Sequence, residues 1–414
     1  MWRVPLLSLA VVTALGCGGG GGPCTTFPSF ASPKDPGGVA GQVEHVDVGL
    51  GVMTANGDCS KVKVTSANAA VADPDNAPVQ ATVEVFNGDD LPNAFARVTF
   101  TPPKPGAYHL SVRFEPNFGT LQRELLVGFD RSDASGHSAP ALTGCTQFGV
   151  SNGQPLCGGE GQLHSLGANA QLDQIDAGRF TVDEAGRVWT TDEGLGTWTL
   201  RAWSVDAGTF VPLAKWAGTG SGSTQGLLAR GGRAVVMADT QMRLFVLETD
   251  GGITNIESHA NPQPMTPQWC MQFVPPAQLA LSDPLMATIS CFLVADTSIT
   301  CSTLPFSVSG LFIPAGADDQ GLWWSDGAKL NLWSATSEGD GGQIVSVSAA
   351  FDLNAPDCSG SEASPVTAGL GLVPRLTDAG IVFEKFPTPA GSVVTATSRY
   401  VVANSNGLWL WWDR

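Results

Sequence analysis

A strand-and-turn unit that recurs about every 40–50 residues is the feature that most restricts how this chain can fold. In each copy a short apolar strand leads into an Asp or Asn turn. A longer strand follows, with Leu, Trp or Phe at alternate positions. The clearest copies are 186–192 with 198–203, 234–239 with 243–247, 321–326 with 329–333, and 400–404 with 408–412. Short strands with this period are typical of a β-propeller, in which each blade has four strands.

The number of blades follows from the spacing of equivalent inner-strand positions. The positions taken as equivalent are Leu200, Leu244, Phe292, Leu332 and Leu410. They are 44, 48, 40 and 78 residues apart, and the last interval is about twice 39. A weakly marked copy is therefore expected near 380–383. Six blades fit best, while five or seven remain open, and a second β-sandwich or a β-solenoid is the structural alternative.

The last copy bears on how the ring closes. The sequence stops at Arg414, with Asp413 alone between it and the long strand 408–412, so no residues remain there for a fourth strand. We therefore expect the start of the domain to donate that strand, with 161–167 pairing beside 408–413. A disulfide between Cys145 and Cys157 would pin this closing segment.

Residues 39–129 have a different pattern, with apolar and polar side chains alternating in short runs between Asn-Gly turns. This alternation predicts strands with one buried and one solvent-facing side. The stretch from Phe100 to Phe114, with a Pro/Gly turn before Tyr108, is similar to the late hairpin of bacterial Ig-like and filamin-type domains. The resemblance implies that Tyr108 buries its ring and bonds to the backbone through its hydroxyl, and that His109 faces solvent.

The first seventeen residues predict export. A positive start ending at Arg3 precedes an apolar run, 4–15, and small residues precede Cys17. Such a segment is a secretory signal, too short and wrongly flanked for a membrane-spanning helix. Its end, Ala-Leu-Gly-Cys, resembles the lipobox of bacterial lipoproteins, with the commoner Leu-Ala order reversed. The resemblance implies cleavage before Cys17 and its acylation with diacylglycerol and palmitate. The alternative is an ordinary secretory signal that is cut nearby.

Five glycines, 18–22, and a Pro/Ser-rich stretch follow Cys17 and predict a flexible tether. Gly18 is not the aspartate that favours inner-membrane retention in enterobacterial lipoproteins, so we expect the outer membrane of a Gram-negative bacterium. Later apolar runs fall short of the roughly 18–20 residues that a membrane helix needs, so the lipid on Cys17 is the expected contact with the bilayer.

The chain is thus expected to be all-β, an Ig-like β-sandwich followed by a β-propeller. The expected parts are a signal peptide at 1–16, a Gly/Pro-rich tether at 17–38, the sandwich at 39–129, a linker at 130–144 and the propeller at 145–414.

The nine cysteines agree with an exported chain, because eight remain once Cys17 is acylated. Eight thiols allow 105 pairings. Proximity within the expected domains, and elimination for the last pair, favour Cys24–Cys59, Cys145–Cys157, Cys291–Cys301 and Cys270–Cys358. The formal net charge of −17 disfavours binding to nucleic acid, whose phosphates such a chain repels.

No recognisable catalytic motif occurs in the sequence. Nucleophile elbows, the HExxH motif, phosphate loops and zinc-binding spacings are all missing, so no cofactor or metal is expected. Two tryptophan pairs, Trp323-Trp324 and Trp411-Trp412, are candidate binding aromatics. Because neighbouring strand residues point to opposite faces, both rings of a pair are buried if blades cover both faces. A ring left exposed would form a sugar- or peptide-stacking surface.

These observations favour a non-enzymatic surface lipoprotein, with the propeller binding an unknown protein or glycan, or stabilising an envelope assembly. The alternative is a propeller hydrolase or lyase acting on extracellular glycan or peptide, with a site assembled from loops on one face of the ring.

Overall fold

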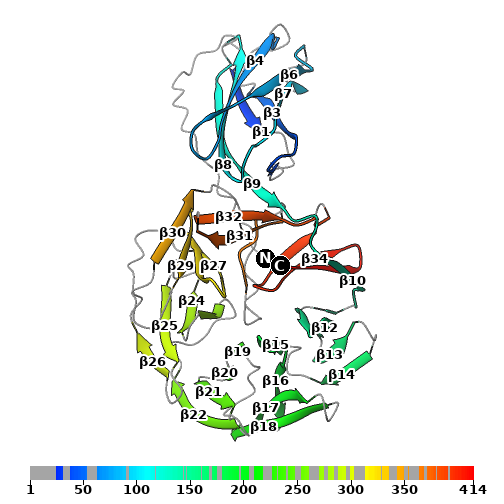
Figure 1. Ribbon diagram of the computed structural model, residues 1–414, viewed down its shortest axis with the longest axis vertical. Coiled ribbons are helices and arrows are strands. Elements are labelled where there is room, and N and C mark those ends of the chain that lie inside the picture. Colours follow the sequence, from blue (N-terminus) through cyan, green and yellow to red (C-terminus); the bar gives the residue numbers. More distant parts are fainter. Residues whose placement is uncertain are drawn as a thin grey trace, which may run out of the picture.

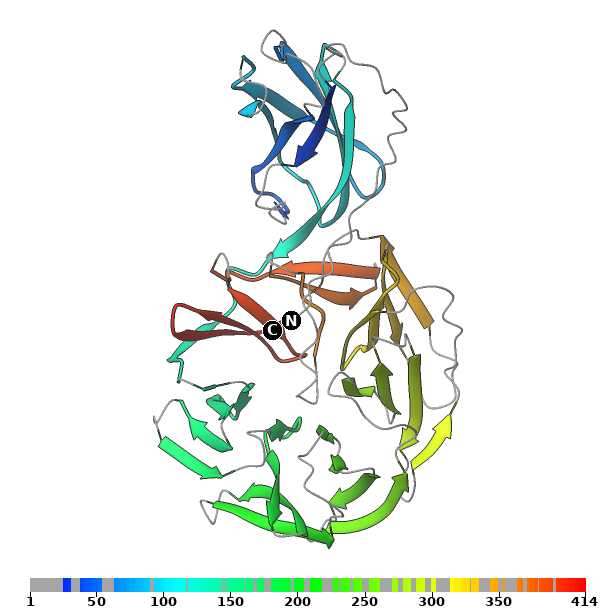
Figure 2. The same cartoon turned by 180° about the vertical axis from the view of Figure 1, so that it is seen from behind.

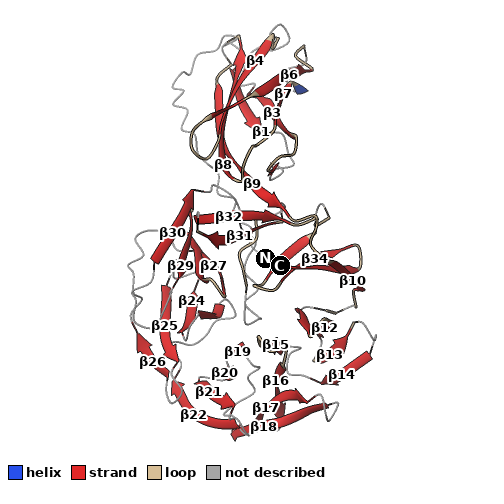
Figure 3. Ribbon diagram, in the orientation of Figure 1, coloured by secondary structure: helices blue, strands red, loops and turns tan. Residues whose placement is uncertain are grey.

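The computed structural model describes residues 25–30, 38–53, 63–89, 93–116, 118–142, 144–145, 147–159, 161–166, 170–174, 180–194, 197–204, 209–217, 226–230, 232–238, 241–247, 253–260, 270–274, 278–283, 288–294, 299–302, 313–327, 329–334, 343–348, 353, 363–367, 371–378, 380–389 and 392–414. Strands and loops account for nearly all of them (Figure 3). No helix in this part of the chain is long and apolar enough to cross a membrane.

The N-terminal domain is a sandwich of two sheets. The first has the order β1 (Thr25–Phe30), β3 (Glu44–Met53), β7 (Phe95–Phe100), β6 (Ala81–Phe86). The second runs β9 (Thr120–Asp130), β8 (Gly106–Glu115), β4 (Ser66–Ala72), β5 (Pro78–Val79), and β2 (Gly38–Val39) pairs with β9. Alternate residues of β7 and β8 are buried between the sheets, as the period-two pattern predicts.

Tyr108 confirms the expectation for the late hairpin. Its ring is fully buried, and its hydroxyl donates a hydrogen bond to the Lys104 carbonyl oxygen at 2.7 Å. The Tyr108 hydroxyl oxygen in turn accepts the Lys104 backbone N–H at 3.2 Å. The next residue, His109, is exposed, with its ring Nδ1 3.6 Å from Glu124 Oε1. Alternation along β8 thus separates the core residue from the surface residue.

Part of the segment expected to be a flexible tether forms a strand. β1 pairs antiparallel with β3 over its whole length, from Thr25 opposite Met53 to Phe30 opposite Val48. The Pro/Ser content predicted a tether, but the Thr and Phe residues of this stretch favour strands, and β3 provides an edge to pair with. Residues 1–24 and 31–37 lie outside the described residues.

The rest of the chain forms a ring of sheets with their first strands toward the centre (Figure 1). We number the sheets of the ring as blades 1 to 7 in the chain order of their innermost strands. Blade 1 is β11 (Gln147–Ser151), β12 (Gln154–Gly159), β13 (Gln162–Ser165) and β14 (Ala170–Gln174). Blade 2 is β15 (Phe180–Val182), β16 (Val188–Gly194), β17 (Thr197–Ser204) and β18 (Thr209–Ala217). Blade 3 is β19 (Gly226–Arg230), β20 (Arg233–Ala238), β21 (Gln241–Leu247) and β22 (Ile253–Ala260). Blade 4 is β23 (Cys270–Val274), β24 (Gln278–Asp283), β25 (Thr288–Val294) and β26 (Ile299–Ser302). Blade 5 is β27 (Ile313–Asp318), β28 (Gly321–Ser325), β29 (Lys329–Ser334) and β30 (Gln343–Ser348). Blade 6 is the hairpin β31 (Leu372–Thr377) and β32 (Gly380–Lys385). Blade 7 is β33 (Val393–Ala396), β34 (Tyr400–Ser405), β35 (Leu408–Asp413) and β10 (Gly136–Pro140).

The described part of the ring therefore has seven sheets, one more than the best-fitting estimate. The five equivalent positions are confirmed, since all lie on third strands: β17, β21, β25, β29 and β35. The weakly marked copy near 380–383 is β32 of blade 6. The repeat pattern does not reveal blade 1, because its strands contain few large apolar residues.

The ring closes with a donated strand, but the expected segment was wrong. β10 pairs antiparallel with β35, from Gly136 opposite Trp412 to Pro140 opposite Leu408. The segment expected in that role contains β13, which pairs with β12 and β14 inside blade 1. The expected linker, 130–144, thus contains a blade strand. The polar, turn-rich composition of 130–144 does not predict a strand. β10 forms there with few apolar residues, because only its Ala139 is buried.

Strand β9 belongs to both domains. It pairs with β8 inside the sandwich, and its last residues pair in parallel with β32, Phe129 opposite Glu384 and Asp130 opposite Lys385. Figure 2 shows this strand leaving the sandwich and reaching the rim of the ring. Gly128 permits the approach, because a Cβ there would lie 2.8 Å from Leu372 Cδ2 and 3.1 Å from the Phe383 carbonyl oxygen. The outer strands of blades 6 and 7 are thus both supplied by consecutive segments, β9 and β10.

Candidate functional site

The four tryptophans proposed as binding aromatics are buried in the ring of blades. Trp323 and Trp324 are 0% and 4% exposed, and Trp411 and Trp412 are 5% and 7% exposed. Trp411 packs in the core shared with blade 1, and Trp412 in the core shared with blade 6. The neighbouring rings therefore fill opposite interfaces, as strand alternation requires. A stacking surface needs an exposed ring, and none of these four provides one.

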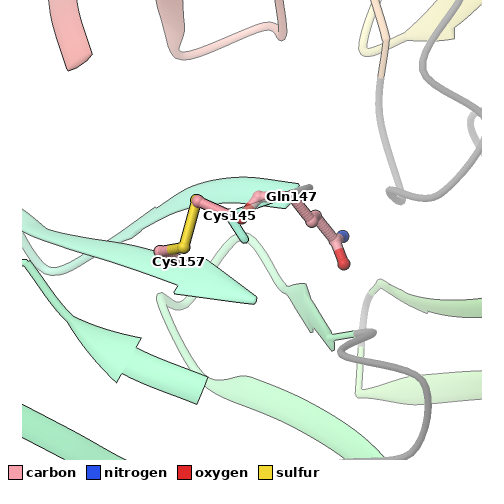
Figure 4. Close-up of a disulfide and its surroundings, with 3 residues drawn as sticks. All are labelled: Cys145, Gln147 and Cys157. Atoms are coloured by element: carbon pink, nitrogen blue, oxygen red, sulfur yellow. Dashed lines mark hydrogen bonds between the residues drawn. A yellow bond between two sulfur atoms is a disulfide. The ribbon is translucent and has the colours of Figure 1, made fainter. Parts of the chain in front are cut away.

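The predicted cysteine pair of blade 1 forms a disulfide (Figure 4). The Cα atoms of Cys145 and Cys157 are 5.6 Å apart, which is in the usual range for a disulfide. Figure 4 also shows Gln147, the first residue of β11, beside the bridge. Its side-chain amide donates to the Phe180 carbonyl oxygen at 2.6 Å and accepts the Phe180 N–H at 3.1 Å, which ties blade 1 to blade 2.

The other predicted pairings stay predictions. Cys270 lies on β23, and the register places Cys291 opposite Ser302 and Cys301 opposite Phe292 on neighbouring strands. Four more cysteines lie outside the described residues: Cys17, Cys24, Cys59 and Cys358.

A carboxylate and an indole pair in the first turn of blade 2. Asp183, only 5% exposed, follows β15, and its Oδ1 accepts the backbone N–H groups of Ala185 at 3.0 Å and Arg187 at 2.8 Å. Its Oδ2 accepts the indole N–H of Trp189 at 2.9 Å. Both oxygens are therefore used within the turn and strand of the same blade.

Blade 5 has the same pair with one oxygen left over. Asp318 ends β27 and is fully buried. Its Oδ1 alone accepts both the Gln320 N–H and the Trp323 indole N–H, each at 3.0 Å. Its Oδ2 accepts the Ser364 hydroxyl at 2.5 Å, from the segment whose Ala363 bridges to Ala317 of blade 5. Ser364 also bridges to Ala396 of blade 7, so this carboxylate connects the inner strands of two blades.

Arg414 extends this contact into a buried network. Its side chain is 6% exposed, and its Nη1 donates to Ser364 Oγ at 2.8 Å and to the Thr397 carbonyl oxygen at 3.0 Å. Its Nε donates to Glu384 Oε2 at 3.3 Å, and its Nη2 donates to the Pro374 carbonyl oxygen. The guanidinium thus joins the first strand of blade 7, the hairpin of blade 6 and, through Ser364, blade 5.

Glu384 carries the network to the sandwich. It is 4% exposed, and its Oε1 accepts Arg131 Nη1 at 2.6 Å and Arg375 Nη1 at 3.3 Å. Arg131 follows β9 directly, and its guanidinium also lies 5.3 Å from the centre of the Phe386 ring. We call Asp318, Ser364, Glu384, Arg131, Arg375 and Arg414 the blade-junction network. Its buried charges are paired and hydrogen-bonded, which is the condition for charge to be tolerated in an interior.

The charges of Glu44 on β3 and Lys385 on β32 also interact across the domain boundary. Burial raises the pKa of Glu44, while the backbone N–H of Val39, at 2.7 Å, and the charge of Lys385 oppose that rise. Burial lowers the pKa of Lys385, and the charge of Glu44 opposes it. Each group therefore favours the charged form of the other across the domain boundary.

The blade-junction network is suited to holding blades together. Burial raises the pKa of the Asp318 carboxyl, and Arg414 and the hydrogen bonds from Ser364, Trp323 and Gln320 oppose the rise. Most donor groups of the blade-junction network bond to acceptors on neighbouring blades, and of its side chains only Arg375 is largely exposed. Among the residues that the structure describes, no group of three or more His, Cys, Asp or Glu is placed to hold a metal.

The chain is thus a sandwich fused to a seven-sheet propeller. No protein-family model matches it, and no curated protein matches its sequence. Solved structures similar to it include a protein of unknown function from Bacteroides thetaiotaomicron, at 12% identity, 93% of this chain, 100% of that chain and a TM-score of 0.36. A catalytically inactive virginiamycin B lyase from Staphylococcus aureus, solved with quinupristin, has 13% identity, 68% and 100% coverage and a TM-score of 0.41. The Lin-41 filamin domain has 16% identity, 26% and 96% coverage and a TM-score of 0.19. At these TM-scores the likenesses carry no argument, and the fold rests on the strand order and register.

Sequence reasoning missed the blade-junction network. Part of it does have a local signal, because an Asp stands three residues before a Gly in both clear copies, Asp183 before Gly186 and Asp318 before Gly321. A Trp follows shortly in each. Arg414, Glu384 and Arg131 have no such signal, since they are brought together only by ring closure.

Proposed function

We propose that this chain is an exported lipoprotein, anchored through Cys17, that acts as a non-enzymatic binding or structural protein of the cell envelope. The sandwich would serve as a stalk, and the propeller would present the interaction surface to a protein or glycan. The bilayer would be contacted through the acyl chains, and the outer membrane of a Gram-negative bacterium is the expected site.

One observation carries the proposal: strand β9 is shared by the sandwich and blade 6. A shared strand replaces a flexible linker, and the Arg131–Glu384 pair reinforces it at 2.6 Å. A surface that is already fixed in orientation loses less freedom when it binds, so a larger part of the contact energy appears as affinity. Rigid presentation of this kind suits a stalk that carries a binding domain.

The Cys145–Cys157 disulfide supports the export half of the proposal. Disulfides persist in oxidising compartments and are rare in the cytosol, where thiols are kept reduced. The secretory signal at 1–16 agrees with this.

Detergent phase partition and mass spectrometry of the mature N-terminus test the anchor. The wild type and Cys17→Ser are compared with the matched control Cys24→Ser, which removes a nearby thiol but keeps Cys17. We expect the wild type and the control in the detergent phase with an acylated N-terminal cysteine, and Cys17→Ser in the aqueous phase. A soluble, unacylated wild type would overturn the anchor. Turnover of extracellular glycans or peptides by the purified chain would favour the hydrolase or lyase instead.

A further inference from the structure

The strand that closes the ring contributes little burial of its own. Of the residues of β10, only Ala139 is buried, and the others are exposed. The ladder to β35 is extended by backbone hydrogen bonds from Ala141 to the Gly407 carbonyl oxygen at 2.9 Å and from Asp413 to the Ser135 carbonyl oxygen at 3.3 Å. Within the strand, His137 lies 3.2 Å from Asp413 Oδ2 and stacks on Trp411. A short, exposed strand paired along one edge is still weak by itself, so the closure also depends on what holds its two ends.

The N-terminal end is held by charge. Arg131 lies shortly before β10, and its backbone N–H donates to the Lys385 carbonyl oxygen at 2.9 Å. Its guanidinium pairs with the buried Glu384, which Arg414 and Arg375 also contact. This end of β10 is therefore fastened to blade 6 independently of the β10–β35 ladder.

The C-terminal end is held by the disulfide. Cys145 lies shortly after β10, and Cys157 on β12 is 1% exposed. Cys157 packs in the same core cluster as Ala139 of β10 and Trp411 of β35. The chain at Gly144 lies so close to β12 that a Cβ on Gly159 would be 1.9 Å from the Gly144 carbonyl oxygen. The covalent bond therefore fixes the exit of β10 against the side of blade 1 that blade 7 packs on.

We propose that Cys145–Cys157 is a redox latch on ring closure: the reduced chain has a loosely held β10, and oxidation locks β10 against β35. The latch is fastened when the two thiols lose two protons and two electrons to a protein disulfide, which becomes a dithiol. It is released when a dithiol gives two electrons and two protons to the S–S bond and becomes a disulfide, or when a phosphine and one water give two thiols and a phosphine oxide. Only the place of oxidation, the envelope, rests on the proposed function.

Hydrogen exchange followed by mass spectrometry tests the latch on the purified mature chain. The wild type is compared with Cys145→Ala/Cys157→Ala, and the backbone amides of the segments 136–140 and 408–413 are followed, Pro140 having none to exchange. We expect these amides to exchange at least about tenfold faster in the double variant, because the opening of a segment becomes cheaper when a constraint beside it is removed. Amides of β8 in the sandwich should keep their wild-type rates.

The matched control is Cys291→Ala/Cys301→Ala, which removes two cysteines from blade 4 and should leave the rates of 136–140 and 408–413 unchanged. Faster exchange confined to 147–159, with 136–140 and 408–413 unchanged, would show a local staple and overturn the latch. If the double variant does not fold, native wild type reduced by a phosphine and alkylated at both thiols takes its place, with the same two outcomes. A failure of lipid anchoring would leave these rates untouched, so the two proposals fail separately.

Discussion

Blades 2 and 5 contain the same Asp–Trp pair and use it differently. In blade 2 the indole lies three residues after the turn glycine, and in blade 5 it lies two residues after it. The shorter spacing lets a single oxygen of Asp318 accept both the turn N–H and the indole N–H, whereas Asp183 needs both oxygens. One residue fewer therefore frees a buried carboxylate oxygen for a neighbouring blade.

The freed oxygen lies where the ring most needs a contact. Among the described residues, blade 6 has two strands of its own, and the end of β9 pairs with the second of them. Asp318, Ser364 and Arg414 supply hydrogen bonds at that junction. The Asp–Trp pair of blade 2 thus stabilises one turn, whereas that of blade 5 also helps to hold blades 5, 6 and 7 together.

Removing the two carboxylates gives the largest expected difference. Asp318→Ala should lower the free energy of unfolding by about 3–5 kcal/mol, because it leaves Arg414 buried without its full set of partners. Asp183→Ala should cost about 1–3 kcal/mol, the penalty for leaving local donors unsatisfied. Chemical denaturation of both variants measures this. Equal losses would contradict the different roles of the two blades.

The arginine side of the junction is tested by Arg414→Met, which keeps the length of the side chain and removes its charge. We expect a loss of about 3 kcal/mol, because Asp318 and Glu384 stay buried with fewer partners. The matched control is Arg375→Met, which contacts the same Glu384 from a side chain that is 51% exposed. It should cost less than about 1 kcal/mol, as exposed ion pairs do. A larger effect of the control would show that Glu384, and not the Arg414 contact, dominates the junction.

How far the sequence predicts this structure depends on whether a feature is local. The alternation around Tyr108, the third-strand positions such as Leu200 and the Cys145–Cys157 pair are local patterns, and each was predicted. The identity of the closing strand was not, because β10 is short and mostly exposed and therefore lacks the apolar pattern that reveals other strands. The blade-junction network could not be predicted either, since Arg131 and Glu384 are 253 residues apart and meet only in the closed ring.

Replacing the two indoles should cost similar amounts of unfolding free energy, unlike replacing the two carboxylates. Trp189→Phe and Trp323→Phe each remove one N–H that is bonded to a buried carboxylate, and each should cost about 2 kcal/mol. The unfolding free energies of the two variants, measured side by side, should agree within about 0.5 kcal/mol. A much larger loss for Trp323→Phe would mean that the indole, too, takes part in the junction between blades.

The smallest effect concerns pH and belongs to Asp318. Because burial raises its pKa above the ordinary value of 3.8, the folded chain holds this proton more tightly than the unfolded chain does. Between the unfolded and the folded pKa the native state binds more protons, so its stability falls as pH rises through that window. Asp318→Asn has no proton to lose there. The stability of the wild type relative to Asp318→Asn should therefore decline as pH increases from about 3.8.

Arg414→Met sharpens the same measurement. Arg414 opposes the rise in the pKa of Asp318, so its removal should raise that pKa further. The free energy of unfolding of Arg414→Met should therefore fall by more than that of the wild type, and the fall should extend to higher pH. Denaturation curves at several pH values for Arg414→Met, with and without Asp318→Asn, give the slope. A slope in Arg414→Met that Asp318→Asn does not abolish would assign the pH dependence to a group other than Asp318. If Asp318→Asn abolishes the slope, the pH dependence belongs to Asp318, whose Oδ2 bonds to the neighbouring segment while both oxygens of Asp183 are used within blade 2.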